Sequence, residues 1–257
     1  MNELFRIDQW VYMIWTAAGL TLLLLVTGAW AIAASAGGGG RFANLVEALV
    51  DFARENIVDA FLGEHGKQWF GFLTALFFFV LFANLLGKLP GPVYGLVGNR
   101  MEQNPHFLLE TPTGNINVTS ALAVMVFVIA QGLGLVKMGP AAYFKKRFLL
   151  PAPKWVQIPT IPIMFLVLLA EPFSLAVRLF ANMTAGHKVI VTFMVADLVG
   201  GVWLITQAPV WAKPVSILPF ALTVALMGFE LLIAFIQAFI FALLSALYLS
   251  ESLEEHH

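Results

Sequence analysis

Tracts without any charged residue set the strongest limit on how this chain can fold. Residues 11–34 (VYMIWTAAGLTLLLLVTGAWAIAA) form one such tract, and residues 68–87 and 115–136 form two more. At about 1.5 Å per residue, a helix of this length crosses a hydrocarbon core roughly 30 Å thick. Hydrophobic residues make up 60% of the chain and charged residues 11%, whereas a soluble domain carries about 25% charged residues. The tracts predict an all-α polytopic membrane protein, with residues 11–34 as a retained first span.

Two longer apolar tracts follow, at about 156–199 and 214–250. Each exceeds the roughly 20 residues that a perpendicular membrane helix needs, so we expect strong tilt or a kink. Prolines, which interrupt helical hydrogen bonding, give candidate kink sites in the first of these tracts at Pro159, Pro162 and Pro172. We therefore expect a single membrane domain over 1–257, with about five membrane helices of which the last two are long and tilted.

The segment 42–62 has a different pattern. Its apolar residues recur at helical spacing and its charged residues lie on the opposite side, the apolar ones being Phe42, Leu45, Val46, Leu49 and Val50. This pattern predicts an amphipathic helix lying on the membrane surface. A helix outside the membrane that packs on a partner has the same periodicity, so both interpretations stay open.

The basic residues predict how the chain is oriented in the membrane. They are densest after the third span, at Lys137, Lys145, Lys146, Arg147 and Lys154. The positive-inside rule places this segment in the cytoplasm, or in the matrix of an organelle. Counting spans in both directions then places the surface helix and the C-terminus inside and the N-terminus outside.

Charge and cysteine content exclude several function classes. The formal net charge is −1, which gives no reason to expect a nucleic-acid partner. The chain contains no cysteine, so disulfides and thiolate metal sites are excluded. We expect neither a metal nor a cofactor.

Polar residues inside the last two apolar tracts are the main functional signal. The first tract contains Glu171, Arg178, Asn182, His187, Lys188 and Asp197, and the second contains Glu230 and Gln237. Lipid offers no hydration to ionisable groups, so inside a membrane they indicate a functional site by default. A structural alternative is that Glu171 only neutralises Arg178 and that His187 and Lys188 lie near an interface.

Helical geometry separates these residues into two groups. At about 100° per residue, Arg178 and Asn182 share a face, whereas His187 points about 180° away and lies roughly 13 Å further along the axis. Glu230 and Gln237, seven residues apart, share a face of the last helix. If the two helices run antiparallel, Gln237 comes to the level of Arg178 and Glu230 to that of His187. We expect one site around the arginine and a separate one around the His/Glu pair.

The two groups differ in chemistry. Arginine stays protonated in proteins, so Arg178 cannot carry a proton, but it holds a fixed positive potential and lowers the pKa of an approaching carboxylate. His187 and Glu230 can both take up and release protons at accessible pH and can pass them through water or to each other. A fixed charge next to a titrating pair predicts a gate beside a proton relay.

Several motifs make most of the chain resemble subunit a of the F-type ATP synthase. They are SLAVRLFANMTAGH (174–187), FELLIAFIQAFIFALLSALYL (229–249), NLLGKLPG (84–91) and PTGNINVT (112–119). The resemblance implies that Arg178 is the family's essential arginine. It also implies that the proton path is lined by Asn182, His187, Glu230 and Gln237, with Glu171 as an accessory residue. Some members have an aspartate where this chain has Asn115 and Asn117, so we expect a different channel entrance.

The same resemblance implies a mechanism and partners. Subunit a faces a rotating ring of c subunits, each with one membrane-buried carboxylate, and two offset aqueous half-channels load and unload that carboxylate on either side of the arginine. The chain has no GxxxxGK[ST] motif, so nucleotide chemistry is expected on other subunits and no enzymatic activity on this one alone. Implied partners are the c-ring, the peripheral stalk b subunits and the rest of the F1Fo complex, most simply in a bacterial plasma membrane.

Two other function classes were weighed against this one. A stand-alone secondary transporter would place its ion site at the membrane midplane, but such folds show two related halves, and we find no internal repeat. A structural membrane anchor would use its charges only to hold helices together. The separation of the titratable groups onto two faces argues against the anchor.

Overall fold

The computed structural model describes residues 2–34, 40–86, 111–148, 153–206 and 217–253. Within these residues all regular structure is helical and no strand occurs. The main helices are α1 (Asn2–Ala34), α2 (Arg41–Ala53), α4 (Gly66–Leu86), α6 (Ile116–Met138), α7 (Pro140–Phe148), α8 (Lys154–Thr206) and α9 (Ile217–Leu253).

Five of these helices are long and apolar enough to cross a membrane. The spans are Met13–Trp30 in α1, Gly66–Leu86 in α4, Ile116–Met138 in α6, Trp155–Gly186 in α8 and Val224–Leu253 in α9. This confirms the predicted all-α polytopic architecture with about five membrane helices. The first long tract continues as helix to Thr206, beyond the expected end at 199, whereas the expected start of the second, at 214, lies outside the described residues.

The amphipathic segment is helical from Arg41 to Leu62, through α2, a π-helical turn η1 (Arg54–Asp59) and the short α3 (Ala60–Leu62). Its apolar side packs on α1, α4 and α9 of the same chain. The buried residues on that side are Ala43, Val46, Ala53, Ile57, Val58 and Leu62. The chain's own helices therefore cover much of the face that sequence alone assigns either to lipid or to a partner.

Two glycines make this packing possible. Gly63, with φ of 48°, follows α3 and reverses the chain towards α4; a positive φ favours glycine because it has no Cβ. Gly28 of α1 lies so close to α2 that a Cβ there would be 2.4 Å from Cγ1 of Val46. The two helices can approach this closely only because position 28 has no side chain.

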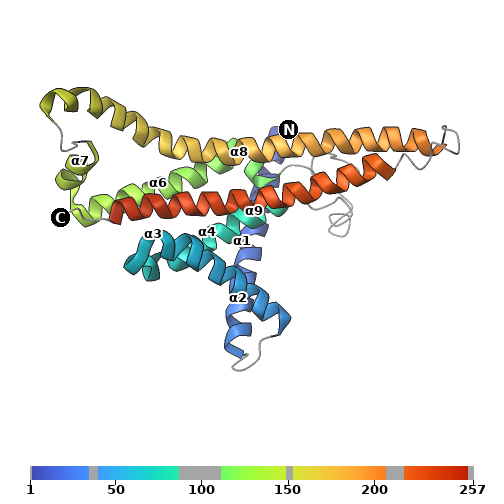
Figure 1. Ribbon diagram of the computed structural model, residues 1–257, viewed down its shortest axis with the longest axis horizontal. Coiled ribbons are helices and arrows are strands. Elements are labelled where there is room, and N and C mark those ends of the chain that lie inside the picture. The colour runs from blue at the N-terminus through green and yellow to red at the C-terminus, as the bar shows by residue number, and fades with distance from the viewer. Residues whose placement is uncertain (1, 35–39, 87–110, 149–152, 207–216, 254–257) are drawn as a thin grey trace.

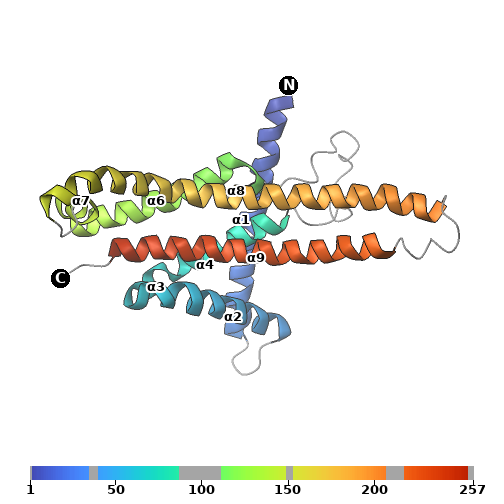
Figure 2. The same ribbon diagram turned by 45° about the horizontal axis from the view of Figure 1, so that its top comes forward.

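Helices α8 and α9 lie side by side and antiparallel, and both cross α1 steeply (Figure 1, Figure 2). Helix α8 is continuous although it contains Pro159, Pro162 and Pro172, and it curves near its N-terminal end in Figure 1. Small residues at four-residue spacing allow neighbouring helices to approach α9 closely. These are Ala234, Ala238, Ala242 and Ala246, all 0% exposed.

The basic segment after the third span is partly helical. Helix α7 covers Pro140–Phe148 and carries three of the basic residues that predict the orientation of the chain. Tyr143 anchors it: the side chain is buried, and a Cβ on Gly134 of α6 would lie 2.7 Å from its ring. This contact brings the cations of α7 up to the C-terminal end of α9, as described below.

Candidate functional site

Arg178 lies on the outer side of α8. The helix buries Leu175, Ala176, Leu179 and Met183 against the rest of the protein, whereas Arg178 is exposed. Among the residues that the structure describes, no carboxylate lies within ion-pair distance of Arg178. The helix thus presents a permanent cation, within an apolar span, at the surface of the isolated chain.

Asn182, one helical turn after Arg178, connects α8 to α9. Its Nδ2 donates a hydrogen bond of 3.2 Å to Oε1 of Gln237, and Gln237 is only 5% exposed. This side-chain contact lies one turn from Arg178, and the predicted level of Gln237 relative to Arg178 stays a prediction. The result is a buried polar contact in an otherwise apolar helix interface, next to the exposed cation.

Glu230 of α9 lies against α8 at Gly186, about two turns after Arg178. Its side chain is 6% exposed, and a Cβ on Gly186 would lie 3.1 Å from its Oε1. The carboxylate therefore packs against the α8 backbone at the residue before His187. The position of the His187 side chain lies outside what the structure describes, so its pairing with Glu230 stays a prediction.

Glu171 pairs with Arg147 of α7, and not with Arg178 as the structural alternative expected. Nη2 of Arg147 in α7 forms an ion pair with Oε1 of Glu171, and Nη1 contacts Oε1 of Glu251 at 2.9 Å. Burial disfavours the charged form of Arg147, but the Glu171 and Glu251 carboxylates outweigh it and raise the pKa of the guanidinium above its usual value. The alternative in which Glu171 neutralises Arg178 is therefore wrong for this structure.

One protein family matches most of this chain. The family model described as ATP synthase A chain matches residues 11–250. The chain belongs to the ATP synthase A chain family. Similar proteins named "ATP synthase subunit a" include those of Myxococcus xanthus, 38% identical over 85% of this chain and 63% of that protein, and Granulibacter bethesdensis, 37% identical over 84% and 77%. In Chloroherpeton thalassium the identity is 34% over 96% and 67%. The chain thus spans roughly two thirds of the length of these relatives.

The two asparagines within the segment PTGNINVT (112–119) lie at the start of α6. Asn115 is the N-cap of α6, and its Oδ1 accepts a hydrogen bond of 2.9 Å from the Asn117 N–H. Such a cap satisfies one of the free amides at a helix start. The Asn117 side chain is exposed. The turn before them, η4 (Pro112–Gly114), packs on α4, α6 and α8.

Asn84 of α4 is a second buried polar group between the helices, and the sequence analysis did not predict it. Asn84 of α4 is 0% exposed; its Nδ2 donates to the Ala234 carbonyl at 3.2 Å, and its Oδ1 accepts from Oγ1 of Thr113 at 2.7 Å. Ala234 lies one turn from both Glu230 and Gln237 on α9. An asparagine inside the apolar tract 68–87 was the available signal, because lipid disfavours an amide without partners.

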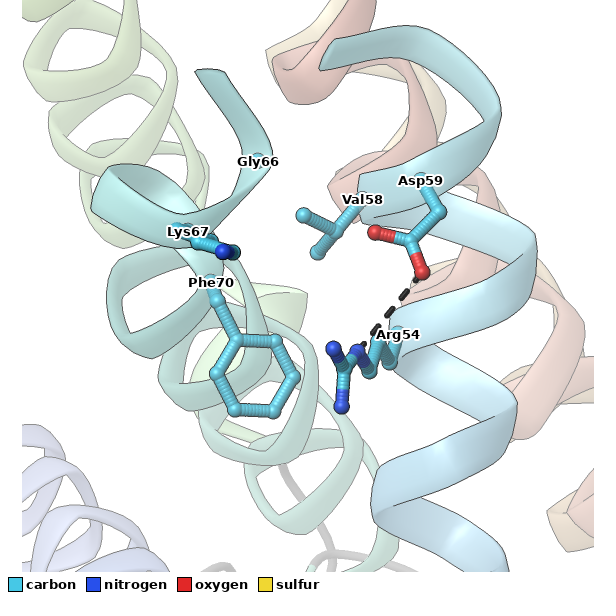
Figure 3. Close-up of a pocket in the computed structure, with 6 residues that line it drawn as sticks. All are labelled: Arg54, Val58, Asp59, Gly66, Lys67 and Phe70. Carbon is cyan, nitrogen blue, oxygen red and sulfur yellow. Dashed lines mark ion pairs between the residues drawn. The ribbon is translucent and has the colours of Figure 1, made fainter. Parts of the chain in front are cut away.

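The described residues also form a pocket of about 180 Å³ away from α8 and α9. It lies between η1 and α4 and is lined by Arg54, Val58, Asp59, Gly66, Lys67 and Phe70 (Figure 3). Arg54 and Asp59, both of η1, pair at 3.6 Å along one wall of the pocket, and both are more than half exposed (Figure 3). The cation of Arg54 also lies 5.9 Å from the centre of the Phe70 ring. None of the intramembrane polar residues discussed above lines this pocket.

Proposed function

We propose that this ATP synthase A chain family member is the proton-channel stator subunit of an F-type ATP synthase, working against a rotating ring of c subunits. The observation that carries the proposal is the exposed Arg178 on a membrane-spanning helix, with no carboxylate within ion-pair distance among the described residues. An intramembrane cation needs a counter-charge. A carboxylate on an adjacent, moving subunit supplies one.

The sign of the charge sets the direction of each step. A ring carboxylate facing lipid holds its proton because burial disfavours the anion. Opposite Arg178 the anion is stabilised, so the carboxylate releases its proton to one half-channel. The same cation repels protons that would cross directly between the two half-channels, so translocation requires rotation of the ring.

The polar contacts between α8 and α9 fit one half-channel. Glu230 is buried against Gly186, and Gln237 contacts Asn182 one turn from the arginine. In our proposal Glu230 and His187 pass protons from the outside face, and Asn182 and Gln237 continue that path towards Arg178. The amides orient water and ring groups, since an amide both donates and accepts hydrogen bonds.

The proposal assigns the remaining roles to partners. ATP chemistry belongs to other subunits of the F1Fo complex, and the peripheral stalk b subunits hold this chain stationary against the ring. We place the complex in a bacterial plasma membrane, with the N-terminus outside and the C-terminus in the cytoplasm. The coupling ion in this scheme is the proton.

Removing and restoring the chain tests this function. Membranes from cells that lack it should hydrolyse ATP without pumping protons, and expression of the chain should restore pumping. In liposomes the purified chain alone should carry no solute against a gradient, whereas a secondary transporter would. Pumping that persists without the chain would contradict the proposal.

A further inference from the structure

Glu171 and Arg178 are seven residues apart on α8, which puts them on nearly the same face about 10.5 Å apart along the axis. Long side chains in helices lean towards the helix N-terminus, so Arg178 leans in the direction of Glu171, whereas Glu171 leans away from it. A pair between them would need the Glu171 carboxylate to turn towards Arg178, and it would give Arg178 a permanent counter-ion within its own chain.

Glu171 already forms an ion pair with Arg147 of α7. The two side chains are 16% and 12% exposed, so their ion pair is largely withdrawn from solvent. Arg147 cannot lose its proton and its planar fork can bind two carboxylates at once, as it does with Glu171 and with Glu251 at 2.9 Å. The carboxylate of Glu171 is therefore held on the side of α7 rather than that of Arg178.

Further contacts hold α7 in the position that this ion pair requires. Nζ of Lys146 in α7 donates to the Glu251 carbonyl at 3.1 Å, and Nζ of Lys137, at the end of α6 just before α7, donates to the Leu253 carbonyl at 2.9 Å. Cations at the C-terminal end of a helix satisfy its last carbonyls and stabilise its dipole. The end of α9 thus fixes α7 next to Glu171.

We propose that Arg147 is a positioning residue for Arg178: by holding Glu171, it keeps Arg178 free to meet a carboxylate of the c-ring. This inference rests on the proposed function. Without Arg147, Glu171 is a poorly hydrated anion whose nearest replacement partner on its own helix is Arg178. An arginine paired in this way no longer offers its full charge to the ring.

A suppressor experiment in the complete complex tests the proposal. ATP-driven proton pumping is measured in inverted membrane vesicles for Arg147→Ala, Arg147→Lys, Glu171→Gln and the double variant Arg147→Ala with Glu171→Gln. Lys145→Ala is the matched control, because Lys145 is an exposed cation of the same helix. Binding of the soluble ATPase sector to the membranes reports assembly for each variant.

The proposal predicts that Arg147→Ala lowers pumping by about tenfold or more, while Arg147→Lys retains more activity and Lys145→Ala pumps as the parent does. The double variant should return to the rate of Glu171→Gln alone, because the competing carboxylate is gone. A residue that only stabilises the fold predicts the opposite, a double variant as inactive as Arg147→Ala. That result, or parental pumping by Arg147→Ala, would overturn the proposal.

The same assay separates this inference from the proposed function. If Arg178→Ala abolishes pumping but the double variant shows no recovery, the role of Arg178 stands and the role of Arg147 fails. If Arg178→Ala still pumps, the proposed function itself fails.

Discussion

Asn182 on α8 and Gln237 on α9 meet in a hydrogen bond of 3.2 Å that crosses an otherwise apolar helix interface. Because Gln237 is 5% exposed, this bond fixes the level of α9 relative to Arg178, one turn away. The two amides therefore link the position of the fixed cation to the position of the proposed relay on the next helix.

Removing either amide should disturb both groups, so their effects should not add. Asn182→Ala and Gln237→Ala should each slow ATP-driven pumping, and the double variant should be little worse than the more harmful single one. A neutral buried hydrogen bond contributes about 0.5–1.5 kcal/mol, which sets the expected coupling. Double-mutant analysis of pumping rates provides the measurement, and strictly additive effects would show that the contact has no functional role.

Gly186 leaves space for the Glu230 carboxylate, and filling that space should slow proton entry. A Cβ at position 186 would lie 3.1 Å from Oε1 of Glu230, so the carboxylate must move by a few tenths of an ångström. Small displacements of reacting groups are costly, and we expect Gly186→Ala to reduce pumping by roughly two- to tenfold.

Gly71→Ala is the matched control for this change, because a Cβ on Gly71 of α4 meets no atom within 4 Å. Pumping rates of the two variants at equal assembly are compared. Equal rates in both would show that the carboxylate does not need its observed position.

Asn84 should matter for stability more than an exposed asparagine does. Its side chain is 0% exposed and joins the Ala234 carbonyl to Thr113, so Asn84→Ala leaves the buried Thr113 hydroxyl without its acceptor, at a cost of about 1–3 kcal/mol. Asn56→Ala is the control, because the exposed Asn56 bonds only to its own helix. Thermal unfolding of the purified complex should show a lower midpoint for Asn84→Ala alone.

Sequence reasoning reached the spans and the partnership of α8 and α9 for identifiable reasons. Uncharged tracts must be helical in lipid because every backbone group needs a partner. Glu230 and Gln237, predicted by their seven-residue spacing to share one face of α9, both contact α8, at Gly186 and Asn182 respectively. The specific partners, Gly186 for Glu230 and Asn182 for Gln237, came only from the structure, because spacing along each helix does not determine which side chains of two helices touch.

The ion pair of Glu171 was beyond sequence reasoning. Arg147 lies 24 residues away in a basic segment that indicates orientation, and only the packing of Tyr143 on Gly134 brings it to Glu171. The nearer cation on the same helix, Arg178, was the obvious partner by periodicity. Contacts made through a third helix leave no periodic signal in the sequence.

The orientation in the membrane remains a prediction that cysteine labelling can check cleanly, because the chain has no native cysteine. A cysteine at exposed position 145 in α7 should react with a membrane-impermeant maleimide only when the cytoplasmic face is accessible, as the dense positive charge there predicts. Labelling of this cysteine in intact cells, where only the outer face is accessible, would show that the predicted orientation is wrong.

The central claim is that Arg178 couples ring rotation to proton movement, and Arg178→Ala in an assembled complex tests it most directly. Arg41→Ala, which removes an exposed arginine of α2, is the control. We expect Arg178→Ala to abolish ATP synthesis and ATP-driven pumping, and Arg178→Lys to restore little, because lysine lacks the planar fork and can lose its proton when buried. Near-parental pumping by a fully assembled Arg178→Ala complex would contradict the account.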